Sequence, residues 1–528
     1  MYLTQPVHRA LQQNPDGPFT IYGERVRTVD ESADRIARLA GALRGLGVQQ
    51  GDRVGILSLN SDRFHEFLLA SWWIGAVVNP VNIRWAAPEI RYSLQQSGTR
   101  TLFVDDTFAP MTGQLLDVLD TVVHCGEQAP VQGTLSYEEL LADAEPVEDE
   151  RHGGDTLAGI FYTGGTTGFP KGVMLSHANM VVSARGGAEG GPPPPTTPHH
   201  PPTPPPNNPP RPGSTTLHAA PMFHLAALAC WNAQLLVGGS HVFIPAFEPL
   251  AALRAIEQHH ATVAMLPPVL IQMLVDHPDR DSYDLSGFRH FTYGGSPMPE
   301  ALLRRAMAAF PAAGFTQAYG MTEVAPLATL LTPADHVEGT RLRSAGRAAP
   351  HTEIKIVGPD GAALPRGEVG EVVIRGGHVM SGYLDDPSET RKVLREGWYH
   401  TGDGAYMDEA GYVFIVDRLK DMIVTGGENV YSAEVENALA QHPAVAAGAV
   451  IGVPDDAYGE RVHAIVILKP GTTATAGELR EHCKTLIAGY KAPRTTEFVT
   501  ELPLSPAGKI LKRELRKPYW EDKDRSVN

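Results

Sequence analysis

The sequence predicts an α/β protein of two or more domains, and three observations carry that prediction. Its 528 residues are well beyond one ordinary domain. Helical and strand patterns alternate through the first half of the chain, which indicates crossover units and a mainly parallel sheet. Strands and glycine turns dominate residues 343–383, which indicates a separate β-rich subdomain, and further strand–helix units follow near the end of the chain.

The expected elements follow from local patterns. Residues 19–26 form a hairpin-like run with a central turn. Residues 28–46 carry apolar side chains at three- and four-residue spacing and stop at Gly47, which is typical of a helix with a C-terminal glycine. Residues 53–58 indicate a buried strand. Later helices and strands are expected at residues 62–74, 77–81, 87–97, 101–104, 157–162, 177–185, 216–218, 226–237, 241–245, 251–259, 263–266, 444–452 and 462–468.

Composition limits the class of protein. The chain carries 44 Lys and Arg against 60 Asp and Glu, a net charge of −16, whereas a nucleic-acid binder needs a basic footprint. Cys125, Cys230 and Cys483 lie far apart, which predicts no disulfide framework or metal site and suggests a reducing compartment. No signal peptide is visible, and the apolar run 67–78 is too short to span a bilayer. A soluble, cytoplasmic protein is expected, and a homodimer is compatible with the sequence.

Residues 191–212 are rich in proline and predict a polyproline-like segment without a packed core. The composition of this segment favours a loop that extends into solvent. Two functional alternatives are a ligand for a proline-recognising partner and a metal-binding pair at His199 and His200.

A glycine- and threonine-rich stretch at residues 161–173 predicts a polyphosphate cradle. Its glycines let the backbone approach a ligand, and successive N–H groups can bind an anion. Threonine hydroxyls add donors, and Lys171 adds a positive charge. The Walker A pattern does not fit, because Phe169 and Pro170 separate Gly168 from the lysine and no Ser or Thr follows it. The alternative is a plain turn between strands.

Three further motifs supply the rest of a nucleotide site. Residues 317–323 offer Tyr319 as a flat apolar partner for an adenine and Glu323 as an oxygen ligand for Mg²⁺ on a triphosphate. Residues 293–297 contain two glycines against which a flat ligand can lie. Asp403 can accept hydrogen bonds from both ribose hydroxyls. Taken singly, each motif is also compatible with an ordinary turn.

Together these motifs resemble those of the AMP-forming acyl-CoA synthetases, in the adenylate-forming superfamily that also holds luciferases and peptide-synthetase adenylation domains. The resemblance spans about residues 10–515 and departs at Gly164, where the family has a serine. It implies a large N-terminal domain of two α/β sheets plus the β-rich subdomain (1–416), a hinge (417–420) and a small, mobile α+β C-terminal domain (421–528). The family has a short loop in place of the proline-rich segment 191–212, which is therefore expected to be an insertion.

The resemblance implies a role for each matching residue. Lys509 would be the catalytic lysine, Lys420 the hinge, and His224 the residue between the acyl pocket and the CoA tunnel, although a histidine among apolar residues is as often a structural group. Metal contacts are implied for Glu323 and Thr166, and CoA contacts for Gly426 and Gly427. The residues implied in ATP or AMP binding are Thr163, Gly164, Gly165, Thr166, Thr167, Gly168, Lys171, Gly295, Ser296, Pro297, Gln317, Ala318, Tyr319, Gly320, Met321, Thr322, Asp403, Arg418 and Lys509.

The pocket for the acid is expected to be apolar. Its candidate lining is His224, Ala226, Ala227, Trp231, Met265, Leu266, Pro267, Gly295, Met321, Val324 and Ala325. Apart from His224 these residues offer no obvious partner for a polar tail, which favours a fatty acid or another apolar acid. Plant hydroxycinnamate ligases are expected to carry an aromatic residue and a lysine where this chain has Ala226 and Ala246, which weakens the hydroxycinnamate interpretation and puts one CoA contact in doubt.

The implied reaction has two steps and uses ATP, Mg²⁺ and coenzyme A. A carboxylate attacks the α-phosphate to give acyl-AMP and pyrophosphate; the C-terminal domain then turns, and the CoA thiol takes the acyl group. The alternatives are an aryl-acid CoA ligase, adenylation for a carrier protein, a luciferase-like oxygenase and a non-catalytic scaffold. The scaffold is disfavoured because the charged groups of the motifs are present: Lys171, Glu323, Asp403, Arg418 and Lys509.

Overall fold

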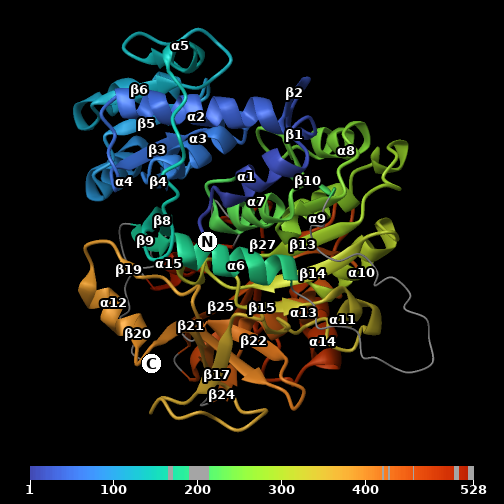
Figure 1. Cartoon of the computed structure of the whole chain (residues 1–528). Helices are drawn as coiled ribbons and strands as arrows, with labels where there is room; N and C mark the ends of the chain where they lie inside the picture. Colours follow the sequence, from blue (N-terminus) through green and yellow to red (C-terminus); the bar gives the residue numbers. More distant parts are fainter. Residues whose placement is uncertain are drawn as a thin grey trace, which may run out of the picture.

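The computed structural model describes residues 1–163, 170–189, 213–418, 421–425, 428–455, 457–504 and 510–520. Two large α/β sheets form the body of the molecule, a smaller sheet follows them, and a further sheet belongs to the C-terminal part (Figure 1). This is the predicted fold class. The proline-rich segment 191–212 lies outside the described residues.

The first large sheet has the strand order β19-β9-β8-β4-β3-β5-β6-β7, and its central strands are parallel. Strands β8 and β9 form an antiparallel hairpin that flanks the glycine-rich stretch. The strands are β3 (Arg53–Leu57), β4 (Val77–Pro80), β5 (Thr101–Val104), β6 (Thr121–His124), β7 (Leu135–Ser136), β8 (Leu157–Thr163), β9 (Lys171–Ser176) and β19 (Gly382–Tyr383). The helices of this part are α2 (Val29–Gly45), α3 (Asp62–Trp73), α4 (Ala87–Ser97), α5 (Tyr137–Asp143) and α6 (His177–Glu189).

The second large sheet has the order β16-β15-β14-β13-β12-β10-β11-β1-β2. The predicted N-terminal hairpin is present as β1 (Pro18–Tyr22) and β2 (Arg25–Thr28), and β1 pairs in parallel with β11, far along the chain. The other strands are β10 (Thr215–His218), β11 (Ser240–Phe243), β12 (Val263–Met265), β13 (His290–Gly294), β14 (Gly314–Tyr319), β15 (Thr329–Leu331) and β16 (Arg347–Ala348). The helices are α1 (Gln5–Gln13), α7 (Leu225–Val237), α8 (Pro249–Gln258), α9 (Pro268–Val275), α10 (Glu300–Ala309) and α11 (Pro333–Glu338).

The β-rich subdomain has different limits from those expected at 343–383. Strands β16 and β19, which fall in that stretch, pair with the two large sheets instead. The smaller sheet has the order β17-β18-β21-β20, with β22 beside β21, and continues to residue 418. It consists of β17 (Glu353–Val357), β18 (Gly370–Arg375), β20 (Leu394–Arg395), β21 (Trp398–Met407) and β22 (Val413–Arg418), with α12 (Pro387–Val393) beside it. Local strand patterns do not reveal which distant strand is the partner.

The C-terminal part has a sheet and a core of its own. Its strands are ordered β24-β23-β26-β25, with β27 beside β26, and Val435, Leu439 and Val450 are among its fully buried residues. The strands are β23 (Ile423–Thr425), β24 (Glu428–Val430), β25 (Val445–Asp455), β26 (Gly459–Leu468) and β27 (Thr495–Phe498); the helices are α13 (Ser432–Ala440), α14 (Ala476–Leu486) and α15 (Lys512–Trp520).

The two large sheets share one hydrophobic core, and helices α3 and α7 meet within it. The indole N–H of Trp231 on α7 donates to Nδ1 of His65 on α3 at 3.0 Å, and all of both side chains is buried. The rings of His218 and His241, from β10 and β11, stack beside this pair, and His218 Nε2 lies 2.9 Å from His241 Nδ1. Hydrogen-bonded polar side chains are therefore buried at the contact between the two sheets.

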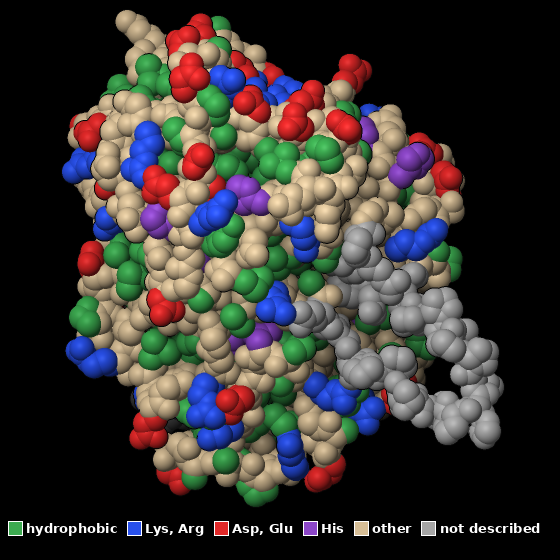
Figure 2. All heavy atoms as spheres, viewed as in Figure 1, with side chains coloured by type: hydrophobic (Ala, Val, Ile, Leu, Met, Phe, Trp, Pro, Cys, Tyr) green, Lys and Arg blue, Asp and Glu red, His purple; other side chains and the backbone are tan. Residues whose placement is uncertain are grey.

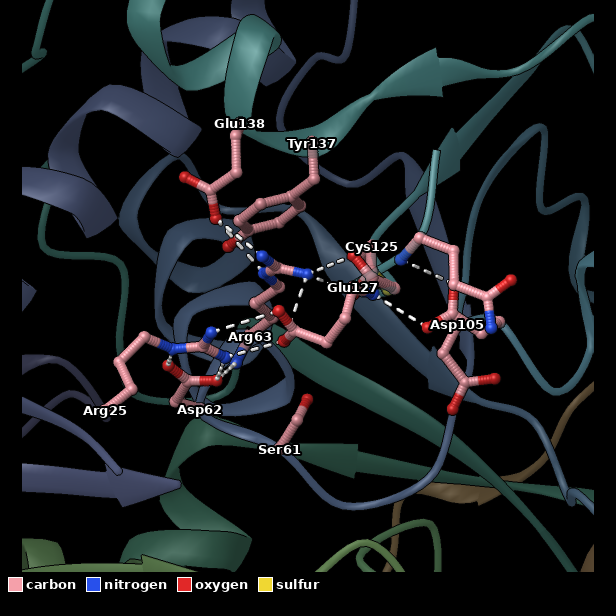
Figure 3. Close-up of polar contacts among 12 residues, drawn as sticks. Arg25, Ser61, Asp62, Arg63, Asp105, Cys125, Glu127, Tyr137 and Glu138 are labelled. Carbon is pink, nitrogen blue, oxygen red and sulfur yellow. Dashed lines mark hydrogen bonds and ion pairs between the residues drawn. The ribbon is translucent and has the colours of Figure 1, made fainter. Parts of the chain in front are cut away.

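A group of ion pairs also joins the sheets (Figure 3). Arg25 on β2 of the second sheet contacts Asp62 at the start of α3 at 2.7 Å and Glu127, in the segment between β6 and β7, at 2.8 Å. Arg63, beside Asp62 on α3, contacts Glu138 on α5 at 3.0 Å. Because Asp62 is almost fully buried, these ion pairs fix the N-terminal hairpin against the start of α3 more firmly than exposed pairs would.

Charged side chains of both signs lie on the surface, and the most apolar stretch of the sequence lies inside the molecule. On the face in Figure 2, acidic and basic side chains are interspersed. The apolar run 67–78 lies in α3 and the start of β4 and is buried. In the part of the chain that the structure describes, no helix combines the length and apolarity needed to cross a membrane.

Acidification is expected to destabilise the fold through the buried histidines. Burial lowers the pKa of His65 and of His218 to about 3 and the pKa of His241 well below its usual value. An unfolded histidine has a pKa near 6.5, so below that pH the unfolded chain binds more protons than the folded chain. The stabilising contribution is complete above pH 6.5 and falls toward pH 3, by about 1.4 kcal/mol per pH unit for each histidine.

Chemical unfolding at a series of pH values between 7 and 5 measures this slope. His65→Gln keeps an acceptor for Trp231 but cannot titrate, and we expect its mean slope over this range to be shallower by about 1 kcal/mol per pH unit. His260→Asn is the matched control, because His260 is exposed and asparagine tolerates its left-handed φ of 50°. Identical slopes for His65→Gln and the unchanged protein would contradict the prediction.

Candidate active site

The ends of β13 and β14 form one wall of the candidate site. Gly294 pairs with Ala318 across these parallel strands, and a Cβ on Gly294 would lie 2.1 Å from the carbonyl oxygen of Ala318. Gly295 has a φ of +78°, which favours glycine, and a Cβ there would meet nothing within 4 Å. The backbone at Gly295 therefore borders open space, where a flat ligand can approach it.

Tyr319 and Asp403 come together from different sheets. Tyr319 ends β14, Asp403 lies on β21, and the tyrosine hydroxyl donates to Asp403 Oδ2 at 2.7 Å. Asp403 is 7% exposed, and Asp403 pairs with Arg418 across β21 and β22. The predicted aromatic partner for adenine and the predicted ribose carboxylate are thus neighbours.

Glu323 follows directly after this wall. It lies in a short 3-10 turn at residues 322–324, is 9% exposed and accepts a hydrogen bond from the Tyr383 hydroxyl at 2.9 Å. Burial and the nearby Glu323 raise the pKa of Tyr383, so the phenol stays protonated and donates. Among the residues that the structure describes, no cluster of three or more His, Cys, Asp or Glu could hold a metal by itself. A single carboxylate still fits Mg²⁺ carried on a triphosphate, because phosphates and water supply the other oxygens.

Lys171 lies on the other side of Tyr383. Its Nζ is 5.2 Å from the centre of the Tyr383 ring and 2.6 Å from Oε2 of Glu389 on α12. Lys171, and then Lys392, lower the pKa of Glu389 to about 2. A pocket of about 320 Å³ opens here, lined by Tyr92, Gln96, Pro170, Lys171, Tyr383, Leu384, Asp386 and Glu389. The charge of the predicted phosphate-binding lysine is therefore balanced by a carboxylate of the same chain.

A second, smaller cavity lies between β10, α7 and β12. It is too narrow in this structure to admit a water molecule, and it is lined by Leu217, His218, Ala220, Ala227, Cys230 and Met265. Ala227 and Met265 were expected in the acyl pocket from the sequence. His224 is the N-cap residue of α7 and packs on Phe223, with ring centres 4.2 Å apart.

The other predicted pocket and nucleotide residues have these positions. Trp231, Leu266, Val324 and Ala325 are buried, and Ala226, Pro267 and Met321 are half-buried. Thr163 ends β8 opposite Lys171, Gln317 accepts a hydrogen bond from Tyr293 at 3.3 Å, and a Cβ on Gly320 would lie 1.9 Å from the oxygen of Pro326. Ser296 and Pro297 follow Gly295, and Thr322 begins the turn that holds Glu323.

Several residues that the sequence predicts for the site are not among those that the structure describes. Their roles stay predictions: Gly164, Gly165, Thr166, Thr167, Gly168, Lys420, Gly426, Gly427 and Lys509. For Arg418 the backbone is described but the side chain is not.

Sequence reasoning missed Tyr383 and Glu389. Tyr383 and Glu389 belong to no motif and reach Glu323 and Lys171 through the pairing of β19 with β9.

The comparisons with known proteins agree with this geometry. Residues 7–384 match the family model of the AMP-binding enzyme, and residues 434–509 match that of the AMP-binding enzyme C-terminal domain. A fatty acid–[acyl-carrier-protein] ligase, ScoC, of Streptomyces coeruleorubidus is 36% identical over 528 residues, covering 100% of this chain and 98% of that protein. A feruloyl-CoA synthase of an Amycolatopsis species is 38% identical over 525 residues, covering 97% and 98%.

A solved structure of the anthranilate CoA ligase AuaEII, in complex with anthranoyl-AMP, superposes with a TM-score of 0.88 at 26% identity and covers 98% of this chain and 97% of that one. The chain belongs to the AMP-binding enzyme family. Within that family it is an AMP-forming acid–CoA ligase.

Glu389 is expected to compete with ATP for Lys171. Replacing it by glutamine removes the ion-pair partner of Lys171, and a partly exposed ion pair contributes about 0.2–1 kcal/mol. Glu389→Gln should therefore lower KM for ATP by a factor of up to about five, with kcat less affected. Steady-state pyrophosphate release at varied ATP measures this change.

Lys392→Met is the matched control, because Lys392 is the other cation on Glu389 and its removal leaves the contact with Lys171 in place. Its KM for ATP should not fall. A higher KM for Glu389→Gln would contradict competition and would mean that Glu389 holds Lys171 in position for the nucleotide.

Proposed function

We propose that the chain uses ATP to convert an apolar carboxylic acid to acyl-AMP and then transfers the acyl group to coenzyme A. The observation that carries this proposal is the hydrogen bond between Tyr319 and Asp403 at the ends of the paired strands β13 and β14, with Glu323 in the turn that follows Tyr319. Tyr319 would cover the adenine and Asp403 would accept the ribose hydroxyls. Glu323 and Thr166 would hold Mg²⁺ on the triphosphate, where the ion neutralises phosphate charge.

The first step joins two anions. The carboxylate oxygen attacks the α-phosphorus, the new O–P bond forms, and the bond to pyrophosphate breaks. The barrier is largely electrostatic, and the groups that would lower it are Lys171, the N–H groups of residues 163–168 and Lys509. The binding of ATP would release Lys171 from its ion pair with Glu389.

The second step needs a different set of groups at the same place. The CoA sulfur attacks the acyl carbonyl carbon, and the carbon–oxygen bond to AMP breaks. Gly426 and Gly427 would line the path of the pantetheine arm, and the hinge at Lys420 would bring them in as Lys509 leaves. The separate sheet and core of the C-terminal part support its movement as one body.

The side chains that line the small cavity are the basis for the proposed class of acid. The apolar side chains Leu217, Ala227 and Met265 suit the fatty acid expected from the sequence. Apolar walls suit the faces of a ring as well as an alkyl chain, so an aryl acid is the second candidate.

Pyrophosphate release across a panel of acids tests the proposal. Short and long fatty acids, benzoate and cinnamate are each supplied with ATP and Mg²⁺, with and without CoA. We expect release with one group of acids, and AMP plus a thioester when CoA is present. Adenylate that forms but never passes to CoA would indicate a carrier protein or an oxygenase reaction instead.

Lys509→Ala separates the two steps. Because the positive charge of Lys509 is proposed to act only while the acid attacks ATP, its loss should reduce adenylation by a factor of about 10² or more. Thioester formation from supplied acyl-AMP and CoA should continue at close to the unchanged rate. Equal loss of both activities would contradict the assigned role.

A further inference from the structure

Tyr383 contacts both of the charged side chains that are proposed to meet the metal and the phosphates of ATP. Its hydroxyl donates to Oε1 of Glu323 at 2.9 Å, and Nζ of Lys171 lies over its ring, 5.2 Å from the ring centre. Tyr383 is 7% exposed and Glu323 is 9% exposed, so water reaches little of either side chain. A residue outside every sequence motif therefore joins the proposed metal ligand to the proposed phosphate-binding lysine.

The backbone around Tyr383 is held from several directions. Tyr383 pairs with Val173 in the antiparallel contact of β19 with β9, and its N–H donates to Oγ1 of Thr390 on α12 at 2.9 Å. The N–H of Met380, three residues earlier, donates to the backbone oxygen of Glu323 at 2.9 Å. The position of the phenol relative to Glu323 is therefore set by strand pairing and by two further hydrogen bonds of the backbone.

A hydrogen bond to one oxygen of Glu323 restricts what the carboxylate does with the other. An ionised carboxylate only accepts, and a bond to it from a neutral phenol is charge-assisted. Burial and the nearby charge of Glu323 raise the pKa of Tyr383, so its hydroxyl keeps the proton that it donates. The phenol takes Oε1 and holds the side chain in one conformation, which fixes the direction of Oε2. A ligand that is already ordered binds a cation without losing that freedom again.

Resting on the proposed function, we propose that Tyr383 is a positioning residue for the metal ion: its hydroxyl orients Glu323 so that Oε2 receives the Mg²⁺ carried by ATP. Hydrogen-bonding partners of metal ligands typically change metal affinity by a factor of about 10–100. The ring acts in the same site, because a cation over an aromatic face keeps an attractive contact when phosphate replaces Glu389 as the partner of Lys171. Tyr383 thus places the metal ligand and the lysine relative to each other.

Binding of ATP in the absence of acid and CoA tests the role of the hydroxyl. The dissociation constant of ATP is measured on the full chain by isothermal titration calorimetry, once with Mg²⁺ and once with EDTA. The ratio of the two constants is the factor by which Mg²⁺ tightens binding. Tyr383→Phe fills the same space and keeps the ring beneath Lys171. We expect it to lower the Mg²⁺ factor severalfold, up to about tenfold, and to leave the dissociation constant in EDTA unchanged.

Tyr137→Phe is the matched control. Tyr137 also donates its hydroxyl to a buried carboxylate, that of Glu66 at 2.6 Å, but it joins α5 to α3. This variant should keep the Mg²⁺ factor even where it lowers stability. Glu323→Gln should lose the factor, and the further change Tyr383→Phe should then have no effect on it, because the hydroxyl acts through the carboxylate.

Three results would overturn the inference and leave the proposed function intact. They are an undiminished Mg²⁺ factor in Tyr383→Phe, the same loss in Tyr137→Phe, and a further loss when Tyr383→Phe is added to Glu323→Gln. Failure of the unchanged protein to bind ATP, with Mg²⁺ or with EDTA, would overturn the proposed function as well.

Discussion

The hydrogen bond from Trp231 to His65 sets how the two large sheets face each other. It joins α7, from the second sheet, to α3, from the first, inside a core where neither group reaches water. An indole N–H can only donate, and a buried donor without a partner costs about 1–3 kcal/mol. The relative position of α3 and α7 is therefore restricted to arrangements that keep this contact. The small cavity takes one of its walls from α7, so its shape depends on the same bond.

The N-terminal hairpin adds a second constraint on the same interface. Arg25 reaches across to Asp62 at the start of α3, and several charged groups around it are satisfied by one another (Figure 3). A cluster of this kind is costly to rearrange, because each charge that lost its partner would be left partly buried. The body of the molecule thus offers a rigid frame, whereas the C-terminal part has a separate core.

Much of the fold could be predicted from local pattern, and the site only in part. The capping box of Thr28 and Glu31 explains why α2 begins where the sequence indicated. Motif order indicated that Tyr319 and Asp403 belong to one site, and the structure brings their side chains into hydrogen-bond contact. The partners Tyr383 and Glu389 could not be predicted, because they approach through strand pairing between distant segments, which no local pattern records.

The pairing of β1 with β11 has a consequence for the synthesis of the chain. Thr20 lies opposite His241, so the first hairpin to leave the ribosome has no sheet to join until β11 has also been made. At usual rates of elongation that interval is about 10–40 s. The central strands of the first sheet, β3 to β6, are complete well before then and can pair with one another. The N-terminal hairpin therefore spends the interval as an unpaired edge, the stage at which a nascent chain is most open to wrong pairing and to chaperones.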